Sequence, residues 1–355
     1  RDARERVSNV DSIIDASPKG DEEKIVELWN QCSEPHRFRI FSEEHADGLP
    51  IQERCLHAKE LVAIVGGIKS VINEQEAHSK NGRLKTWENE TNIVSKFKEH
   101  RDILANSSYA LKRVGDRALL AKKLGEAFAG LKTSCVTKSD RAAVKIWKEY
   151  GKLLSQYESE ESLKPNIVDA ETRVNAVDAI IQASLDSLEE RIIQLWAGCP
   201  LIQDSVIAVT EKVGDQTIND RYAIAATRVK ATDEIITVDN RQDNLSKNGQ
   251  PITWENESQI LSIFEKYRNV LIDSIYVQKK LGNRVKQARD ILQGYINLRK
   301  ASEEDNWLDI NDIWANNPRL HDLDHTQGEK KQFEFIADAV RALKLFKRAY
   351  EATPN

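Results

Sequence analysis

The sequence contains no methionine and little glycine or proline, with 15 Gly and 8 Pro in 355 residues. So few turn-forming residues disfavour an all-β fold with many tight turns. No run of 18 apolar residues occurs, and we expect no segment to span a membrane. The four cysteines lack the spacing of a metal site or disulfide framework. This pattern is typical of a reducing compartment, so we expect a cytoplasmic location.

The chain also lacks an excess of positive charge. Its net charge is −5, although 31% of its residues are charged. This balance argues against general nucleic-acid binding, for which a basic footprint is expected. The stretch from 112 to 152 is locally basic, which is usual for a solvated helix face. Nucleic-acid binding through this stretch is the weakest of three functional alternatives, and steep salt dependence would be its signature.

The chain begins at Arg1 and has no methionine. We therefore expect it to be a piece of a longer protein, and the absence of a targeting segment at Arg1 carries little weight.

What the chain does contain is a recurring amphipathic segment that ends in an aromatic residue. Residues 21–32 (Asp-Glu-Glu-Lys-Ile-Val-Glu-Leu-Trp-Asn-Gln-Cys) return as 189–199, with the Trp and the Cys displaced by 167 positions. Ile25, Leu28 and Trp29 fall at helical spacing. Including fainter copies, the aromatic residues are Trp29, Phe97, Trp147, Trp196, Phe264 and Trp314. Their separations of 68, 50, 49, 68 and 50 residues give a long-short-short pattern twice.

This pattern predicts an all-α fold. A single helical hairpin cannot bury both of its faces, so successive hairpins are expected to stack into one continuous core. We predict a solenoid of about six αα-hairpins, arranged as two tandem three-hairpin copies over 1–167 and 168–326. A polar connector, Ser159–Asn166, marks the midpoint. Residues 327–355 are predicted to form a C-terminal capping helix whose apolar face closes the last hairpin. That face consists of Phe335, Ile336, Ala339, Leu343 and Phe346.

Two smaller patterns concern helix packing. Arginine is followed four residues later by alanine in four predicted helices, as Arg54/Ala58, Arg117/Ala121, Arg221/Ala225 and Arg284/Ala288. Residues with this spacing share a helix face, and we expect the small residue to admit a partner helix while the arginine stem lies over the seam. Gly66 and Gly67 interrupt another predicted helix. They indicate either a closely packed neighbour or a bend.

The aromatic-ended repeats resemble those of α-solenoid helical-hairpin proteins. Their period of 50–68 residues differs from the roughly 34 of tetratricopeptide repeats. It is closer to armadillo and HEAT repeats, but none of their motifs is present. An aromatic-ended helix after a Gly-Asp or Ser-Asp turn also resembles repeats of large bacterial multidomain signalling proteins. The resemblance implies a non-enzymatic scaffold or regulatory module.

The best-repeated short motif is a turn followed by a helix start. Ser-Lys-Asn-Gly at 79–82 and Thr-Trp-Glu-Asn-Glu at 86–90 recur at 246–249 and 253–257. Shared turn geometry explains Asn-Gly and the capping Thr, but not the repeated Ser, Lys, Glu and Asn residues. Since exposed loops commonly carry contacts, we predict a partner-binding role for Lys80, Asn81, Trp87, Lys247, Asn248 and Trp254. The structural alternative is that both Trp residues staple the turn against the long helix.

One cluster has metal-ligand character, namely His321, Asp322, Asp324 and His325. No further ligand set accompanies it, and we assign it no metal role. We therefore expect no enzyme activity, no catalytic residue and no cofactor. The expected partner is another protein or another domain of the parent chain, and neither a membrane nor nucleic acid. The alternative function is that of a helical metal-dependent hydrolase that uses acidic and His residues.

Overall fold

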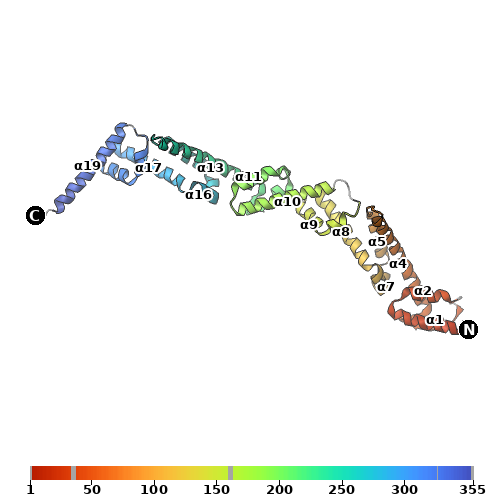
Figure 1. The fold of residues 1–355 in the computed structure, drawn as a ribbon. Helices are drawn as coiled ribbons and strands as arrows, with labels where there is room; N and C mark the ends of the chain where they lie inside the picture. The colour runs from red at the N-terminus through yellow and green to blue at the C-terminus, as the bar shows by residue number, and fades with distance from the viewer. Residues whose placement is uncertain (1, 33–36, 159–162, 326, 353–355) are drawn as a thin grey trace. The chain divides into compact units, whose positions relative to one another are not determined.

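The computed structural model describes residues 2–32, 37–158, 163–325 and 327–352. Within them the fold is all-α, apart from two pairs of two-residue strands (Figure 1). None of the described helices combines the length and apolar character that a bilayer crossing requires. Residues 159–162 of the predicted connector, residues 33–36 and residue 326 lie outside the described residues.

The chain divides into two compact units, Arg1–Val174 and Asn175–Asn355. The division falls within helix α10 (Leu163–Leu185), so the second half of the predicted connector is helical.

The first unit is built from helices joined by short turns. In order, its elements are α1 (Asp2–Ala16), η1 (Ser17–Lys19), α2 (Glu22–Gln31), α3 (Ile40–Glu43), β1 (His45–Ala46), β2 (Leu49–Pro50), α4 (Ile51–Lys80), α5 (Trp87–Glu99), α6 (Arg101–Leu104), α7 (Ser108–Ala110), a π-helical turn η3 (Leu111–Gly115), α8 (Asp116–Val136) and α9 (Asp140–Leu154). Strand β1 pairs antiparallel with β2 immediately before α4.

The second unit has nearly the same order of elements. They are α11 (Glu189–Gly198), η4 (Pro200–Ile202), α12 (Val206–Thr210), β3 (Lys212–Val213), β4 (Gln216–Thr217), α13 (Ile218–Lys247), α14 (Trp254–Lys266), α15 (Arg268–Leu271), α16 (Ile275–Leu281), α17 (Arg284–Glu303), α18 (Trp307–Asn316), η5 (Pro318–Asp322) and α19 (Gln327–Ala352). Strand β3 pairs antiparallel with β4, in the place that β1 and β2 take in the first unit.

The longer helices pack mainly against their neighbours along the chain. In the first unit α1 packs on α2, α2 on α4, α4 on α5, α5 on α8 and α8 on α9. In the second, α11 packs on α13, α13 on α14, α14 on α17, α17 on α18 and α18 on α19. Each unit therefore has a chain of local apolar clusters, as clusters around Val10–Ala58 and Leu61–Ala121 illustrate in the first.

Buried ion pairs join these helices at repeated positions. In each pair a carboxylate lies seven residues before one of the repeat aromatics, and an arginine lies on a later helix. The pairs are Glu22–Arg54, Glu90–Arg117, Asp140–Arg173, Glu189–Arg221 and Glu257–Arg284. Four of these arginines are those predicted from the Arg/Ala spacing, and all four alanines are buried. The predicted seam is confirmed, and the arginines prove to be anchored by carboxylates that the spacing alone did not indicate.

Backbone conformations also recur at equivalent positions of the two copies. Left-handed φ values occur at Gly20 and Ser187, at Asp47 and Gly214, at Gly82 and Gly249, and at Lys138 and Asp305. Since L residues rarely adopt positive φ, these shared turns reflect local geometry rather than shared composition.

From their place on the apolar helix faces, the six repeat aromatics are expected to be buried in the core, and three of them are. Trp29, Trp196 and Trp314 are buried. Trp147, Phe97 and Phe264 are only half-buried. For the two phenylalanines the physical reason is that they line open grooves, which are described below.

The predicted apolar face of the C-terminal helix is only partly covered. Ile336 is buried against α18, but Phe335, Leu343 and Phe346 are exposed. The first half of α19 therefore covers the last cluster, while the apolar side chains Leu343 and Phe346 of its second half stay exposed.

Helix α4 runs through Gly66 and Gly67 without interruption. A Cβ atom added at Gly66 would meet nothing within 4 Å, and one at Gly67 would meet only Lys96 Nζ at 3.6 Å. Among the described residues, therefore, nothing packs closely against Gly66, and Gly67 has only the end of the Lys96 side chain at ordinary contact distance.

Candidate partner-binding grooves

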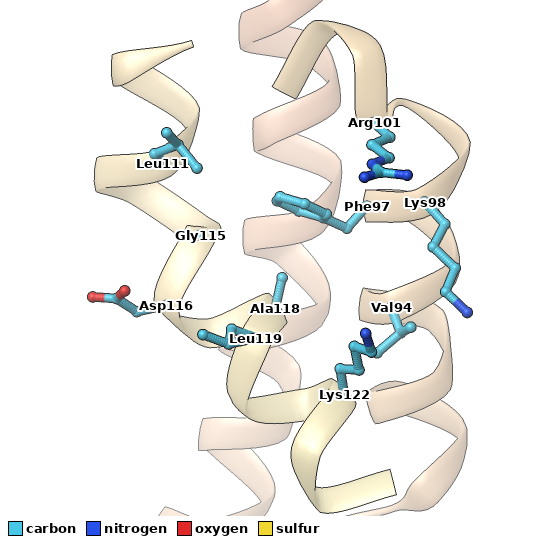
Figure 2. A pocket seen from close by; sticks show the side chains of 10 residues that line it. All are labelled: Val94, Phe97, Lys98, Arg101, Leu111, Gly115, Asp116, Ala118, Leu119 and Lys122. Carbon is cyan, nitrogen blue, oxygen red and sulfur yellow. The ribbon is translucent and has the colours of Figure 1, made fainter. Parts of the chain in front are cut away.

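The first unit contains a groove of about 670 Å³ between two helical walls (Figure 2). One wall is α5 with α6, and the other is the π turn η3 with the start of α8. The apolar lining consists of Val94, Phe97, Leu111, Ala118 and Leu119. In Figure 2 the Phe97 ring projects into the space between the walls. The groove thus offers an apolar surface at a position where the repeat places a core aromatic residue.

The rim of this groove is cationic. Lys98 and Arg101 come from the α5–α6 wall, and Lys122 comes from α8. Lys122 lies 3.9 Å from Glu126 within its own helix, whereas Lys98 and Arg101 make no ion pair with the described residues. The lining carboxylate, Asp116, points away from Phe97 in Figure 2. The groove therefore combines an apolar floor with cations at its edge, although the Lys98 ammonium, like the Asp116 carboxylate, points away from Phe97 in Figure 2.

A buried polar network fixes the two walls relative to each other. Glu90 of α5 accepts hydrogen bonds from both terminal nitrogens of Arg117 on α8. It also accepts one from the Tyr157 hydroxyl at 2.7 Å and one from Gln75 at 3.0 Å. Burial by itself would raise the pKa of Glu90, but the hydrogen bonds from Arg117, Tyr157 and Gln75 hold that pKa below its ordinary value. The carboxylate stays charged, and the arginine keeps α8 in place.

A π turn forms part of the groove wall. Residues 111–115 form i→i+5 hydrogen bonds, which widen the turn and often mark functional sites. Gly115 ends this turn, and a Cβ atom there would come within 3.3 Å of Leu111 Cδ2. The side chain of Leu111, which lines the groove, is thus free to lie against the glycine.

The second unit has a groove at the same repeat position. Its volume is about 230 Å³, and Phe264, Arg268, Gly282, Lys286 and Arg289 contribute to its lining. Phe264, Arg268, Gly282 and Arg289 follow Phe97, Arg101, Gly115 and Lys122 by 167 positions.

The charged residues of the two grooves differ at three positions, because Glu265, Asn283 and Lys286 stand where the first copy has Lys98, Asp116 and Leu119. Glu265 replaces Lys98, and it lies 3.1 Å from Arg289 and 3.7 Å from Arg268. The second groove is smaller, and its two arginines pair with Glu265, whereas Lys286 makes no ion pair with the described residues.

The two Ser-Lys-Asn-Gly turns are exposed, as predicted. Lys80, Asn81, Lys247 and Asn248 all lie at the surface at the ends of α4 and α13. Their partner-binding role stays a prediction.

The asparagines of the repeated Thr-Trp-Glu-Asn-Glu motif have a structural explanation. Asn89 and Asn256 are buried, and each donates its side-chain amide to a glutamine of the preceding long helix, Gln75 or Gln242. The glutamines also bond the backbone of the capping threonines. This part of the motif holds the turn together.

The two predicted tryptophans lie in different surroundings. Trp87 stacks on Phe128 and Tyr157, with ring centroids 4.1 and 4.5 Å away, and its indole nitrogen donates to the Glu158 carbonyl at 2.6 Å. Trp87 is thus held within the fold, but against α8 and the segment after α9 rather than against the preceding long helix, as the structural alternative had it. Trp254 lies 6.1 Å from Tyr295 and is 38% exposed. Of the two, Trp254 alone offers a substantial part of its ring to a partner.

The histidines of the metal-like cluster make intramolecular contacts. The His321 ring stacks on Trp314 at 4.3 Å, and its Nε2 lies 3.0 Å from the Trp314 carbonyl. His325 is buried, with Nε2 2.7 Å from the Leu320 carbonyl. Within the described residues no three His, Cys, Asp or Glu side chains are grouped so that they could hold a metal ion.

The grooves were not predicted from the sequence. Two residue types that recur at equivalent positions of the two copies could have indicated them. These are a glycine that precedes the second helix (Gly115 and Gly282) and a cation four residues after the aromatic (Arg101 and Arg268). Comparison with models of protein families, with curated proteins and with solved structures found no match for this chain.

Proposed function

We propose that this chain is a non-enzymatic helical-repeat scaffold in which two tandem three-hairpin copies form a solenoid. The equivalent element order, the recurring ion pairs and the shared left-handed turns support this arrangement. Packing between successive helices also suits it, because each solenoid repeat contacts mainly its neighbours.

In this proposal the first groove binds an acidic segment of a partner protein. The observation that carries it is the apolar floor around Phe97 together with the unpaired rim cations Lys98 and Arg101. Apolar side chains of the partner bury against the floor, and its carboxylates meet the rim. Such complementarity supplies specificity and speeds association. The volume is within the range of ligand sites in general, and the open shape suits an extended or helical segment.

The buried carboxylates support a structural rather than a catalytic role. A general acid needs a raised pKa, and the pKa of Glu90 is lowered instead. The carboxylates of the other four repeated pairs likewise face arginines at 2.6–2.8 Å. The metal-dependent hydrolase alternative gains no specific observation from these residues.

The test uses a fluorescent synthetic helix with Leu at i, i+3 and i+4 and Glu elsewhere. It should bind the full chain, and Lys98→Glu should weaken binding about tenfold, corresponding to about 1.4 kcal/mol. This variant copies the charge of Glu265, the equivalent residue of the second copy.

The matched control is Lys123→Glu, because Lys123 is exposed beside Lys122 but does not line the groove. It should bind the peptide as the unmodified chain does. If both variants bound the peptide equally weakly, the loss would come from the change in net charge, and the proposed groove would be contradicted.

A further inference from the structure

The second half of α19 presents an apolar stripe to solvent. In its first half Phe333, Ile336, Ala337 and Val340 are buried in the cluster that includes Trp314 of α18. Further along the helix, Leu343 and Phe346 are 64% and 75% exposed. A helix that only capped the last cluster would not need these residues.

These exposed residues fall at core positions of the repeat. The apolar positions of α19 follow those of α10 at a constant offset, one position short of the repeat spacing. Phe333, Ile336 and Val340 correspond in this register to Ile167, Ala170 and Val174, and Leu343 and Phe346 correspond to Val177 and Ile180. Val177 and Ile180 are completely buried. The same alignment of α19 with α10 matches the buried residues of the first half of α19 to buried residues of α10. It also matches the exposed Leu343 and Phe346 to residues of α10 that are buried.

The first unit shows what covers such a face. Val10 and Ile13 of α1 are the counterparts of Val177 and Ile180 in the first copy. They lie in one buried cluster with Ile25 and Trp29 of α2, and α1 packs directly on α2. The occupant of this position is therefore an amphipathic helix that ends in an aromatic residue.

The positive charges on α19 favour binding of an acidic helix that is otherwise like α2. Residues 341–348 contain four cations, Arg341, Lys344, Lys347 and Arg348, and no carboxylate. Three of them lie 3.3–3.9 Å from exposed carboxylates, in pairs that solvent weakens. The α2 segment 21–31 has four carboxylates and one lysine. An approaching helix of the α2 type therefore has opposite charge, which favours association.

We propose that Leu343 and Phe346 form an acceptor face for an acidic, aromatic-ended amphipathic helix of a partner protein, which would occupy the position that α2 takes on α1. This surface is distinct from the groove of the proposed function and does not depend on it. A basic amphipathic helix can also bind anionic membranes, but membrane binding would not require the repeat register.

The experiment measures binding of a fluorescent peptide with the sequence of residues 21–31, held helical by a staple on its polar side, to the full chain. We expect saturable binding that the double variant Leu343→Ser/Phe346→Ser weakens at least about tenfold. Because both residues are exposed, folding should be preserved, as circular dichroism would verify. A peptide with Ser in place of the residues that match Ile25 and Trp29 should not bind.

The matched control is Leu345→Ser. Leu345 is 65% exposed, but it lies off the stripe because it does not share helical spacing with Leu343. It should leave peptide binding unchanged. No peptide binding, or equal weakening by Leu345→Ser, would overturn the proposal. So would binding to phosphatidylserine vesicles without peptide binding, or self-association of the chain that requires Leu343 and Phe346.

Discussion

At the scale of single residues, the repeat has a polar as well as an aromatic position. The aromatic residue buries apolar surface, which favours the packing of one helix on another but does not fix their relative orientation. The carboxylate seven residues earlier, as in Glu22 before Trp29, helps to fix that orientation, because its arginine partner must bind in a defined geometry. Replacing such a pair by apolar residues need not destabilise a protein, whereas removing one partner leaves a buried charge unpaired.

The first prediction concerns Glu90→Gln. The substitution leaves Arg117 without its carboxylate and should lower the free energy of unfolding by about 3 kcal/mol at neutral pH. Urea denaturation followed by circular dichroism measures this change. Glu88→Gln is the control, because Glu88 is exposed in the same helical turn and should change stability by no more than about 0.5 kcal/mol.

The same pair gives a pH dependence of defined sign. Because the pKa of Glu90 in the folded state lies below its ordinary value of 4.5, its contribution is fully present above that value and is lost as the pH falls through the folded-state pKa. The stability difference between the unmodified chain and Glu90→Gln should therefore narrow on acidification below about pH 4. A difference that stays constant would contradict the charge-based account.

At the scale of elements, the second prediction concerns the middle of α4. Gly66 is exposed, and a Cβ atom there meets nothing. Gly66→Ala should therefore stabilise the helix by up to about 1 kcal/mol. A higher midpoint of thermal unfolding would show this. A lower midpoint would mean that the glycine serves a bend or a contact that the described residues do not show.

The helices themselves were predictable because their signals are local. Apolar spacing, the capping Thr residues at 86 and 253, and the Asn-Gly turns all act within a few residues. The carboxylate partners of Arg54 and Arg117 were missed because charged residues that open a helix have an adequate local explanation in the helix dipole. The grooves were missed for a further reason. Whether Phe97 is covered depends on how α8 leaves the π turn, and this is a property of packing rather than of periodicity.

At the scale of the whole molecule, the third prediction concerns how far the destabilisation caused by one core substitution spreads along the chain. Trp196 is buried and stacks on Tyr222 at 4.6 Å. Trp196→Ala should cost about 4 kcal/mol through lost apolar transfer and a residual cavity. Hydrogen exchange should show reduced protection in α11 and α13, while α2 and α4 keep theirs, because packing runs between neighbours along the chain.

Trp307→Ala is the control for this prediction, because that side chain is 44% exposed. It should cost about 1 kcal/mol or less. Loss of protection in α2 and α4 after Trp196→Ala would show that the two units unfold as one.

The difference between the two grooves bears on how many partner molecules one chain can hold. Two open grooves would let one chain hold two partner molecules, and linked partners would then gain avidity through effective concentration. If only the first groove binds, as proposed, the chain holds one partner molecule at this position despite its two copies. It would then recruit a partner in one-to-one stoichiometry without cross-linking it, and the spare copy would be free to acquire another specificity.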